Sequence, residues 1–332
     1  MVVDFTNFFV VLFIIGTVFS VGLNLLLEHI DYNFRKKHGK KIPSELSEHI
    51  TTDILTKTGE YDNARYALWI PRMLVTTSLS VVLLLFGFYP HVFNTIWNMT
   101  AGVAGDIAQK TAQLAPNGNV YLTIIFFALI ASLPGAIVDI PFALYREFSI
   151  EKRFGFSKMT AKLWVIDQLK SLLVSAVLVL PLLLLVICAF EKTQGLWWFW
   201  VASGYTVFSL FLSIIYPLCI APLFNTFTPL EDGELKTRLT NILERCGFQA
   251  NGLFVIDASK RSKHSNAYFT GFGKAKRVVL YDTLIEQMDM DEIEAVLAHE
   301  LGHYKLHHIF RRFCTIIPLV FVVLYLISLF IT

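Results

Sequence analysis

Six long apolar stretches constrain the fold of this 332-residue chain more than any other feature of its sequence. Each approaches or exceeds the roughly 20 residues that a helix needs to cross the hydrocarbon core of a bilayer. They lie at about residues 7–27, 66–89, 120–144, 165–190, 196–224 and 311–332. Hydrophobic residues make up 55% of the chain and charged residues 16%, a balance that argues against an ordinary soluble domain. The sequence therefore predicts a mainly α, polytopic membrane helix bundle in contact with the lipid bilayer.

The first apolar stretch begins near the N-terminus without the features of a removable secretory leader. It has neither a basic segment before it nor a small-residue cleavage site after it. We expect it to be a retained membrane anchor. Residues 1–224 then form a five-span bundle, and residues 311–332 form a sixth span within which the chain ends.

The distribution of basic residues predicts how the bundle is oriented. The connector after the first stretch carries seven lysines and arginines, and the connector after the third carries five. The connectors after the second and fourth have only Lys110 and Lys192, and residues 225–312 carry twelve. Because basic loops stay on the cytoplasmic side, we expect the N-terminus to face outward and residues 225–310 to face the cytosol. The membrane would be that of the endoplasmic reticulum in a eukaryote and the plasma membrane in a bacterium.

The segment between the fifth and sixth stretches has the pattern of a small α+β insert. Helical spacing over 231–246 ends at Gly247, and short β-prone runs occupy 253–256, 266–272 and 277–281. A helix follows from about 289 to 310, and Asp289 with Glu292 forms a capping box at its start. By contrast, the glycines and Pro116 between residues 90 and 119 predict a turn-rich outer loop.

The predicted helix carries the sequence His299-Glu300-Leu301-Gly302-His303. Imidazoles four residues apart project from one face of a helix, one turn above the other, so both can bind one zinc ion. The Glu300 carboxylate lies beside the metal, where it can take a proton from a metal-bound water. The H-E-x-x-H pattern thus predicts a zinc metallopeptidase site, with one Zn²⁺ per chain, and a cytosolic catalytic insert of the zincin kind.

Asn266, Ala267 and Tyr268 form the second candidate feature. Alone, these residues indicate only a turn or a strand fragment. Beside a zinc site, a strand with an open edge can hold an extended peptide by main-chain hydrogen bonds, to which the Asn266 amide can add another. We therefore expect these residues to bind and align a peptide or protein substrate.

Two further histidines, His307 and His308, follow on the same predicted helix. On a straight helix, His307 lies about 12 Å beyond His299 along the axis, too far to share its metal. His308 faces about 100° away from His307. We expect both at a solvated or membrane-edge position, with a supporting role behind the metal ligands as the alternative.

A third zinc ligand is not evident from the sequence. A catalytic zinc ion normally has three protein ligands, and no aspartate or glutamate follows Glu300. Asp282, Glu286 and Glu294 precede the motif, but no spacing argument singles out one of them. The chain also ends inside an apolar stretch, which leads us to expect the front part of a longer protein or a shortened gene product.

Several strings together resemble the integral-membrane zinc CAAX prenyl proteases, the type I endopeptidases. They are IPFALYREFSIEKRFGF (140–156), APLFNTFTPL (221–230), HSNAYFTGFG (264–273), VLYDTL (279–284) and AVLAHELGH (295–303). The resemblance implies that His299 and His303 bind zinc, that Glu300 is the general base and that Asn266 and Ala267 line the substrate strand. It also implies a third ligand, a glutamate beyond Thr332, and substrates that are farnesylated proteins ending in Cys-aliphatic-aliphatic-any residue.

Two rival functions remain open at the level of the sequence. One is a membrane quality-control zinc protease that acts on unprenylated substrates. The other is a catalytically incomplete fragment or membrane scaffold, suggested by the missing third ligand. No basic patch interleaved with aromatic residues indicates nucleic acid, and no obligate protein partner is evident.

Overall fold

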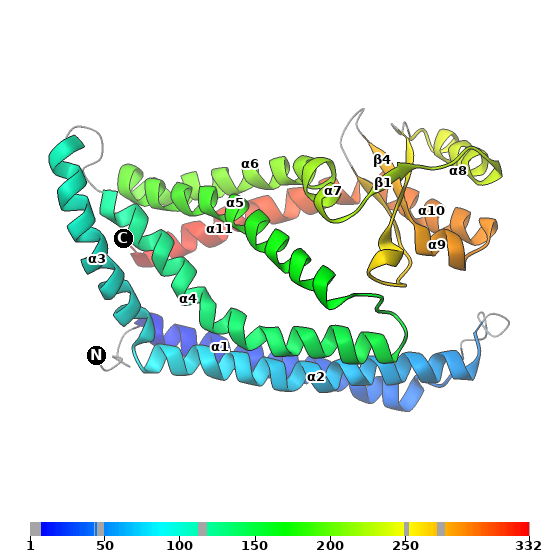
Figure 1. Ribbon diagram of the computed structural model, residues 1–332, viewed down its shortest axis with the longest axis horizontal. Helices are drawn as coiled ribbons and strands as arrows, with labels where there is room; N and C mark the ends of the chain where they lie inside the picture. Colours follow the sequence, from blue (N-terminus) through cyan, green and yellow to red (C-terminus); the bar gives the residue numbers. More distant parts are fainter. Residues whose placement is uncertain are drawn as a thin grey trace. The chain divides into compact units, whose positions relative to one another are not determined.

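The computed structural model describes residues 8–42, 44, 50–111, 118–248, 252–270 and 276–331. By its internal contacts the chain divides into two compact units, Met1–Gly155 and Phe156–Thr332 (Figure 1). The sequence predicts a division at residue 224 by a different criterion, namely which part of the chain lies in the bilayer and which part lies outside it. That division stays a prediction.

The first unit is built of long helices. In order they are α1 (Phe8–His38), α2 (Thr52–Leu85), α3 (Phe88–Thr111) and α4 (Gly118–Tyr145), which continues into the π-helical turn η2 (Arg146–Glu151). Helix α1 packs along α2, and α2 and α3 both pack against α4 (Figure 1). The ring of Tyr32 on α1 stacks on that of Tyr66 on α2, with centroids 5.2 Å apart. The expected loop between residues 90 and 119 is therefore wrong for residues 90–111, which lie in α3.

A bidentate ion pair joins α2 to α4. The Arg72 Nε and Nη2 atoms donate to the two carboxylate oxygens of Asp139, over 2.9 and 2.8 Å. Both residues lie within apolar helices, where a charged side chain is costly unless it is paired or reaches water. The pair explains how the Asp139 carboxylate is accommodated within an apolar helix, because Arg72 on the neighbouring helix donates to both of its oxygens.

Six of the described helices are long and apolar enough to span a membrane. They coincide with the six apolar stretches of the sequence, and 17% or less of the most apolar window of each is buried inside the protein. Large apolar side chains such as Val18 and Phe19 are 67% exposed, as expected for surfaces that face lipid. The chain is a multi-pass integral membrane protein.

The second unit combines membrane helices with the α+β insert. Its membrane part begins with α5 (Ala161–Thr193), followed by the short turn η3 (Gln194–Leu196) and α6 (Trp197–Ile215). Helix α6 continues through the π-helical turn η4 (Tyr216–Ile220) into α7 (Ala221–Phe224), and α11 (His308–Ile331) follows the insert. The insert contains β1 (Phe227–Pro229), α8 (Glu234–Arg245), β2 (Leu253–Ile256), η5 (Ala258–Lys260), β3 (Ala267–Thr270), β4 (Arg277–Tyr281), α9 (Asp282–Gln287) and α10 (Met290–Lys305). The expected α8, β2, β3 and β4 are present, whereas β1 was not predicted.

The insert contains a mixed sheet of four strands in the order β1-β2-β4-β3. Strand β2 runs parallel to β4, and β1 and β3 pair antiparallel at the two edges. In the β3–β4 register, Ala267 lies opposite Leu280 and Tyr268 opposite Val279. Helix α10 packs against β3, so an edge strand and the helix with the histidine motif are neighbours.

Helix α10 has well-defined ends. The Asp289 side chain accepts from the Glu292 N–H over 2.9 Å, and the Glu292 side chain accepts from the Asp289 N–H over 3.0 Å, so the predicted capping box is confirmed. At the other end the helix stops at Lys305, and His307 has a left-handed φ of 54°. The expectation of one helix through residue 310 is therefore wrong, because the chain turns at His307 and α11 starts anew at His308.

We predict that Leu297→Ala selectively weakens the insert. Leu297 is fully buried in the core that α10 shares with the sheet and α8. Removing its side chain should lower the free energy of local unfolding by about 2–5 kcal/mol, as for other buried leucines. Amide hydrogen exchange of α10 in detergent measures this change.

The matched control is Met290→Ala, at the first position of the same helix, where the side chain is 38% exposed. It should change the same free energy by less than about 1 kcal/mol. Equal effects of the two substitutions would contradict the assignment of Leu297 to the core.

Candidate active site

The packing of α10 decides where the histidine motif faces. Ile293, Leu297 and Leu301 form a stripe at most 2% exposed against the insert core. His299 and His303 are both exposed, and at about 100° per residue they project from the face away from that stripe. The apolar positions thus hold the helix so that both imidazoles leave the core on the same side.

The two imidazoles converge. The Nε2 atoms of His299 and His303 are 3.2 Å apart, with ring centroids 4.8 Å apart. Two nitrogen ligands at about 2.0–2.1 Å on a tetrahedral ion lie about 3.3–3.4 Å from each other. The pair therefore has the nitrogen spacing that one zinc ion requires.

Glu300 lies between the histidines in sequence and is half-buried. It makes no hydrogen bond or ion pair with any residue that the structure describes. A carboxylate without a protein partner, next to the first imidazole, is free to accept a proton from a nearby water.

His308 approaches the motif from the start of α11. Its Nδ1 atom is 2.7 Å from Nδ1 of His303, and the other ring nitrogen of His303, Nε2, faces His299. The left-handed turn at His307 makes this contact possible, since on a straight helix His308 would point elsewhere. His308 is half-buried and contacts His303, and its expected alternative role behind the metal ligands stays a prediction.

Strand β3 presents its backbone at the edge of the sheet. The Asn266 carbonyl accepts from the Tyr281 N–H over 3.0 Å, which fixes which backbone groups of β3 face β4. In an antiparallel pair, the N–H and C=O groups of every second residue point away from the partner strand. The backbone groups of Ala267 and Phe269 therefore face the open edge of the sheet. The Ala267 side chain is 3% exposed in the core, so this residue has only its backbone to offer a substrate.

Asn266 is held at the start of β3 by two contacts. Its Oδ1 accepts from the Ala267 N–H over 2.9 Å, and its side chain also hydrogen-bonds the Tyr281 hydroxyl. Its side chain is exposed. The amide expected to contact substrate therefore already caps one of the outward backbone donors of the strand.

Tyr268 faces the other side of the sheet from Ala267. It packs against the small cluster of Ile256, Ala258 and Val279, and its ring meets that of Tyr281 edge-on at 6.3 Å. Burial raises the pKa of the Tyr268 hydroxyl to about 12, so this group is protonated at neutral pH. The side chain supports the strand, and the hydroxyl remains a neutral hydrogen-bonding group.

Within the described part of the chain, no group of three His, Cys, Asp or Glu side chains is positioned to hold a metal ion. The acids weighed as a third ligand have other contacts or positions. Asp282 accepts from the Ser259 and Thr283 N–H groups, both over 2.8 Å, Glu294 pairs with Arg238, and Glu286 is exposed on α9. His264 stacks on Phe156, with ring centroids 4.4 Å apart.

Comparisons with known proteins cover nearly the whole chain. A family model described as the CAAX prenyl protease N-terminal region, with five membrane helices, matches residues 31–226. The model of peptidase family M48 matches residues 229–332. CAAX prenyl protease 1 of Saccharomyces cerevisiae is 36% identical over 88% of this chain and 63% of its own length. A Dictyostelium discoideum homologue is 35% identical over 92% of this chain and 71% of its own.

A solved structure shares the fold. The crystal structure of Saccharomyces mikatae Ste24p superposes with a TM-score of 0.78 at 32% identity, covering 92% of this chain and 69% of that one. A membrane helix bundle with a paired-histidine helix beside an edge strand defines the class of integral-membrane metallopeptidases. Within that class, the chain belongs to the CAAX prenyl protease family of peptidase family M48. It spans about 63% of the length of the yeast relative.

Proposed function

We propose that the protein is a membrane zinc metalloendopeptidase that hydrolyses peptide bonds near the C-terminus of prenylated CAAX proteins. The observation that carries the proposal is the 3.2 Å separation of the His299 and His303 Nε2 atoms, next to an unpartnered Glu300 carboxylate and an edge strand. The family resemblance supports the substrate class, since the relatives are named CAAX prenyl proteases.

The chemistry of the donors fits the metal that the family implies. Two imidazole nitrogens at this spacing suit Zn²⁺, with His299 and His303 as its ligands. When bound, zinc lowers the pKa of a coordinated water toward 7 and polarises a carbonyl. The third ligand that the family resemblance implies stays a prediction.

The roles of the protein groups follow from their positions. Glu300 accepts the proton of the attacking water and returns it to the leaving amine. The outward-facing Ala267 carbonyl and the backbone of Phe269 pair with an extended substrate and hold the scissile carbonyl beside the histidines, while the Ala267 N–H stays bonded to Asn266. Asn266 and Tyr268 fix the start of this strand, which limits the conformational freedom that the strand loses when substrate binds.

The proposed orientation places the histidine motif at the cytosolic side of the membrane. The support is the alternation of basic and neutral connectors along the sequence. Prenylated proteins carry their C-terminal tails on that side, so orientation and substrate agree.

We expect Glu300→Gln to retain the metal and lose turnover. The amide keeps the shape of the side chain but cannot accept the proton, so kcat/KM should fall by about 10²-fold or more. Metal content per chain and peptide cleavage, measured on the same preparation, test this.

The control for this experiment is Glu286→Gln, the same substitution at an exposed position of α9. It should cleave like the parent. Turnover of Glu300→Gln within about tenfold of the parent would refute Glu300 as the general base, and absence of cleavage in both the parent and the control would support a scaffold.

We infer that His308 orients His303 through the Nδ1–Nδ1 contact, so that the Nε2 lone pair of His303 faces the metal. Partners of this kind typically contribute 10–100-fold to metal affinity. We therefore predict that His308→Ala weakens zinc binding by about 10–100-fold in a competition with a chromophoric chelator, a readout independent of catalysis.

His307→Asn is the matched control, because asparagine tolerates the left-handed conformation that His307 adopts. It should bind zinc like the parent. Equal zinc affinities of the parent and His308→Ala would leave the contact without a role in metal binding.

The substrate class is tested with one peptide sequence presented in three forms: farnesylated at the cysteine, unmodified, and unmodified but carrying an N-terminal myristoyl chain. Each buried CH₂ group contributes about 0.8 kcal/mol, so even partial burial of the farnesyl group should raise kcat/KM more than about tenfold. The myristoylated form separates recognition of the prenyl group from delivery to the membrane. Equal cleavage of all three forms would favour the quality-control protease instead.

A further inference from the structure

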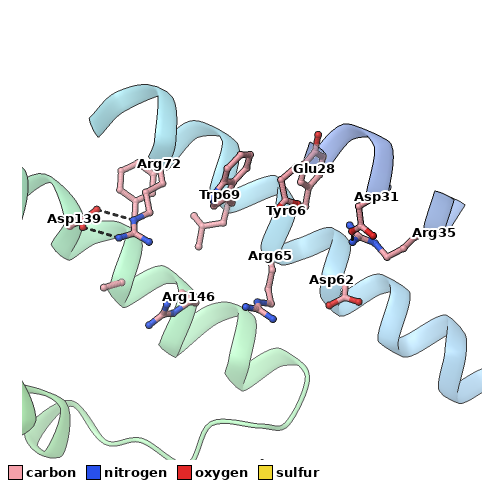
Figure 2. Close-up of a pocket in the computed structure, with 13 residues that line it drawn as sticks. Glu28, Asp31, Arg35, Asp62, Arg65, Tyr66, Trp69, Arg72, Asp139 and Arg146 are labelled. Atoms are coloured by element: carbon pink, nitrogen blue, oxygen red, sulfur yellow. Dashed lines mark hydrogen bonds and ion pairs between the residues drawn. The ribbon is translucent and has the colours of Figure 1, made fainter. Parts of the chain in front are cut away.

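A charged cavity of about 410 Å³ lies in the first unit, between α1, α2 and α4 (Figure 2). This volume is within the roughly 300–1,000 Å³ typical of ligand pockets. Four arginines and four acidic residues line the cavity, together with the aromatic rings of Tyr66 and Trp69. None of these residues belongs to the proposed catalytic site.

Four of the eight charged residues in the cavity form two ion pairs. Arg35 pairs with Asp31 on α1, and Arg72 pairs with Asp139 across α2 and α4. The remaining charges make no ion pair with any residue that the structure describes. They are two cations, Arg65 and Arg146, and two anions, Glu28 and Asp62.

The unpaired charges come from different walls of the cavity. Arg146 begins η2 at the end of α4, Glu28 lies on α1, and α2 supplies both Arg65 and Asp62. Figure 2 shows the Arg65 side chain extending from α2 toward the helix that carries Arg146. The guanidinium of Arg65 lies 5.4 Å from the centre of the Tyr61 ring, a contact that leaves its N–H donors without a carboxylate. A group that carries both signs of charge would complement this cavity.

A hydrogen-bond donor in the cavity wall also lacks a partner. The Nε atom of Arg35 is buried and has no hydrogen-bond partner among the described residues. The same guanidinium pairs with Asp31 through Nη1, so its ion pair is only partly complemented within the described part of the chain.

The cavity lies where the apolar spans give way to charged sequence. Its residues come from the C-terminal part of α1, the N-terminal part of α2 and the C-terminal end of α4, and the basic run 35–41 directly follows its α1 wall. Tyr66 and Trp69 are the residue types that gather at the level of lipid headgroups. On the same helices, Ile30 and Ile140 are 56% and 46% exposed, which provides apolar surface for acyl chains beside a polar cavity.

We propose that this cavity binds the headgroup of a zwitterionic phospholipid, one that carries a phosphate and an adjacent ammonium group. Arg65 and Arg146 donate to the phosphate oxygens, and Glu28 and Asp62 accept from the ammonium group. Basic pockets between membrane helices on the cytoplasmic side are known to hold phospholipid headgroups, and here the acids add selectivity. The proposal does not depend on the proteolytic activity.

The test is native mass spectrometry of the purified chain released from micelles that contain phosphatidylethanolamine, phosphatidylcholine or phosphatidylglycerol. A separate arm uses free phosphoethanolamine, which presents the same headgroup without acyl chains. We expect retained phosphatidylethanolamine to exceed phosphatidylglycerol, and free phosphoethanolamine to bind far more weakly than the lipid. If phosphoethanolamine binds as tightly as the lipid, the site recognises a soluble ligand and the lipid proposal is overturned.

Two double variants separate the two halves of the headgroup. Arg65→Gln with Arg146→Gln should weaken binding of all three lipids by about 25-fold, at about fivefold for each arginine. Glu28→Gln with Asp62→Asn should lower affinity for phosphatidylethanolamine and leave phosphatidylglycerol bound as well as before or better. Loss of the preference between these two lipids is the specific result that a general effect on folding would not produce.

Lys57→Gln is the control, since it removes one exposed positive charge from α2 outside the cavity. It should retain lipid like the parent. Parent-like lipid retention by the Arg65/Arg146 variant would overturn the proposal, as would parent-like lipid selectivity of the Glu28/Asp62 variant. If the Arg65/Arg146 variant lost binding of a substrate peptide but retained lipid, the cavity would be assigned to a peptide instead.

Discussion

The packing of one apolar stripe of α10 against the insert core positions the two histidines and Glu300 of the motif. Ile293, Leu297 and Leu301 are almost fully buried, and this burial fixes the rotation of the helix about its axis. A different rotation would bury the imidazoles, and burying a polar ring without a hydrogen-bond partner costs free energy. The same core holds Ala267 of β3, so the helix with the histidines and the strand with the open edge share one apolar contact.

The site depends as much on where α10 ends as on what it contains. The capping box at Asp289 fixes its start, and the left-handed residue His307 fixes its end. Because the chain turns there, His308 meets the far edge of the His303 ring, and α11 begins with a residue that contacts the motif. The junction between the insert and α11 is therefore part of the proposed metal site.

In the first unit, lipid surroundings impose a different constraint. Charged side chains there must pair with each other, reach water or bind a ligand, because hydrocarbon does not solvate them. Arg72 and Asp139 satisfy this rule as a pair across two helices. Arg65, Arg146, Glu28 and Asp62 do not pair with one another, and their placement around one cavity is the reason to look for a ligand of mixed charge.

Much of the fold could be predicted, because it depends on patterns local in the sequence. Apolar length predicts the membrane helices, and short β-prone runs predict β2 and β4. The glycines within α3 instead favour turns, and the three residues of β1 carry too little periodicity to predict a strand. No local pattern predicts that β3 lies at the edge of the sheet, because strand order depends on pairing between distant segments. The sequence suggests an open edge there only because the strand precedes the zinc motif.

The sequence by itself determined the class of the protein, its membrane helices and the two imidazoles, since a spacing of four residues on a helix brings side chains together whatever surrounds them. Only the tertiary structure decided that His308 contacts His303, that the Asn266 amide caps its own strand, and that four charges without an ion pair among the described residues line one cavity. These features join residues through a chain reversal, a sheet edge or three separate helices. No local pattern records such contacts, because they arise only when distant segments pack.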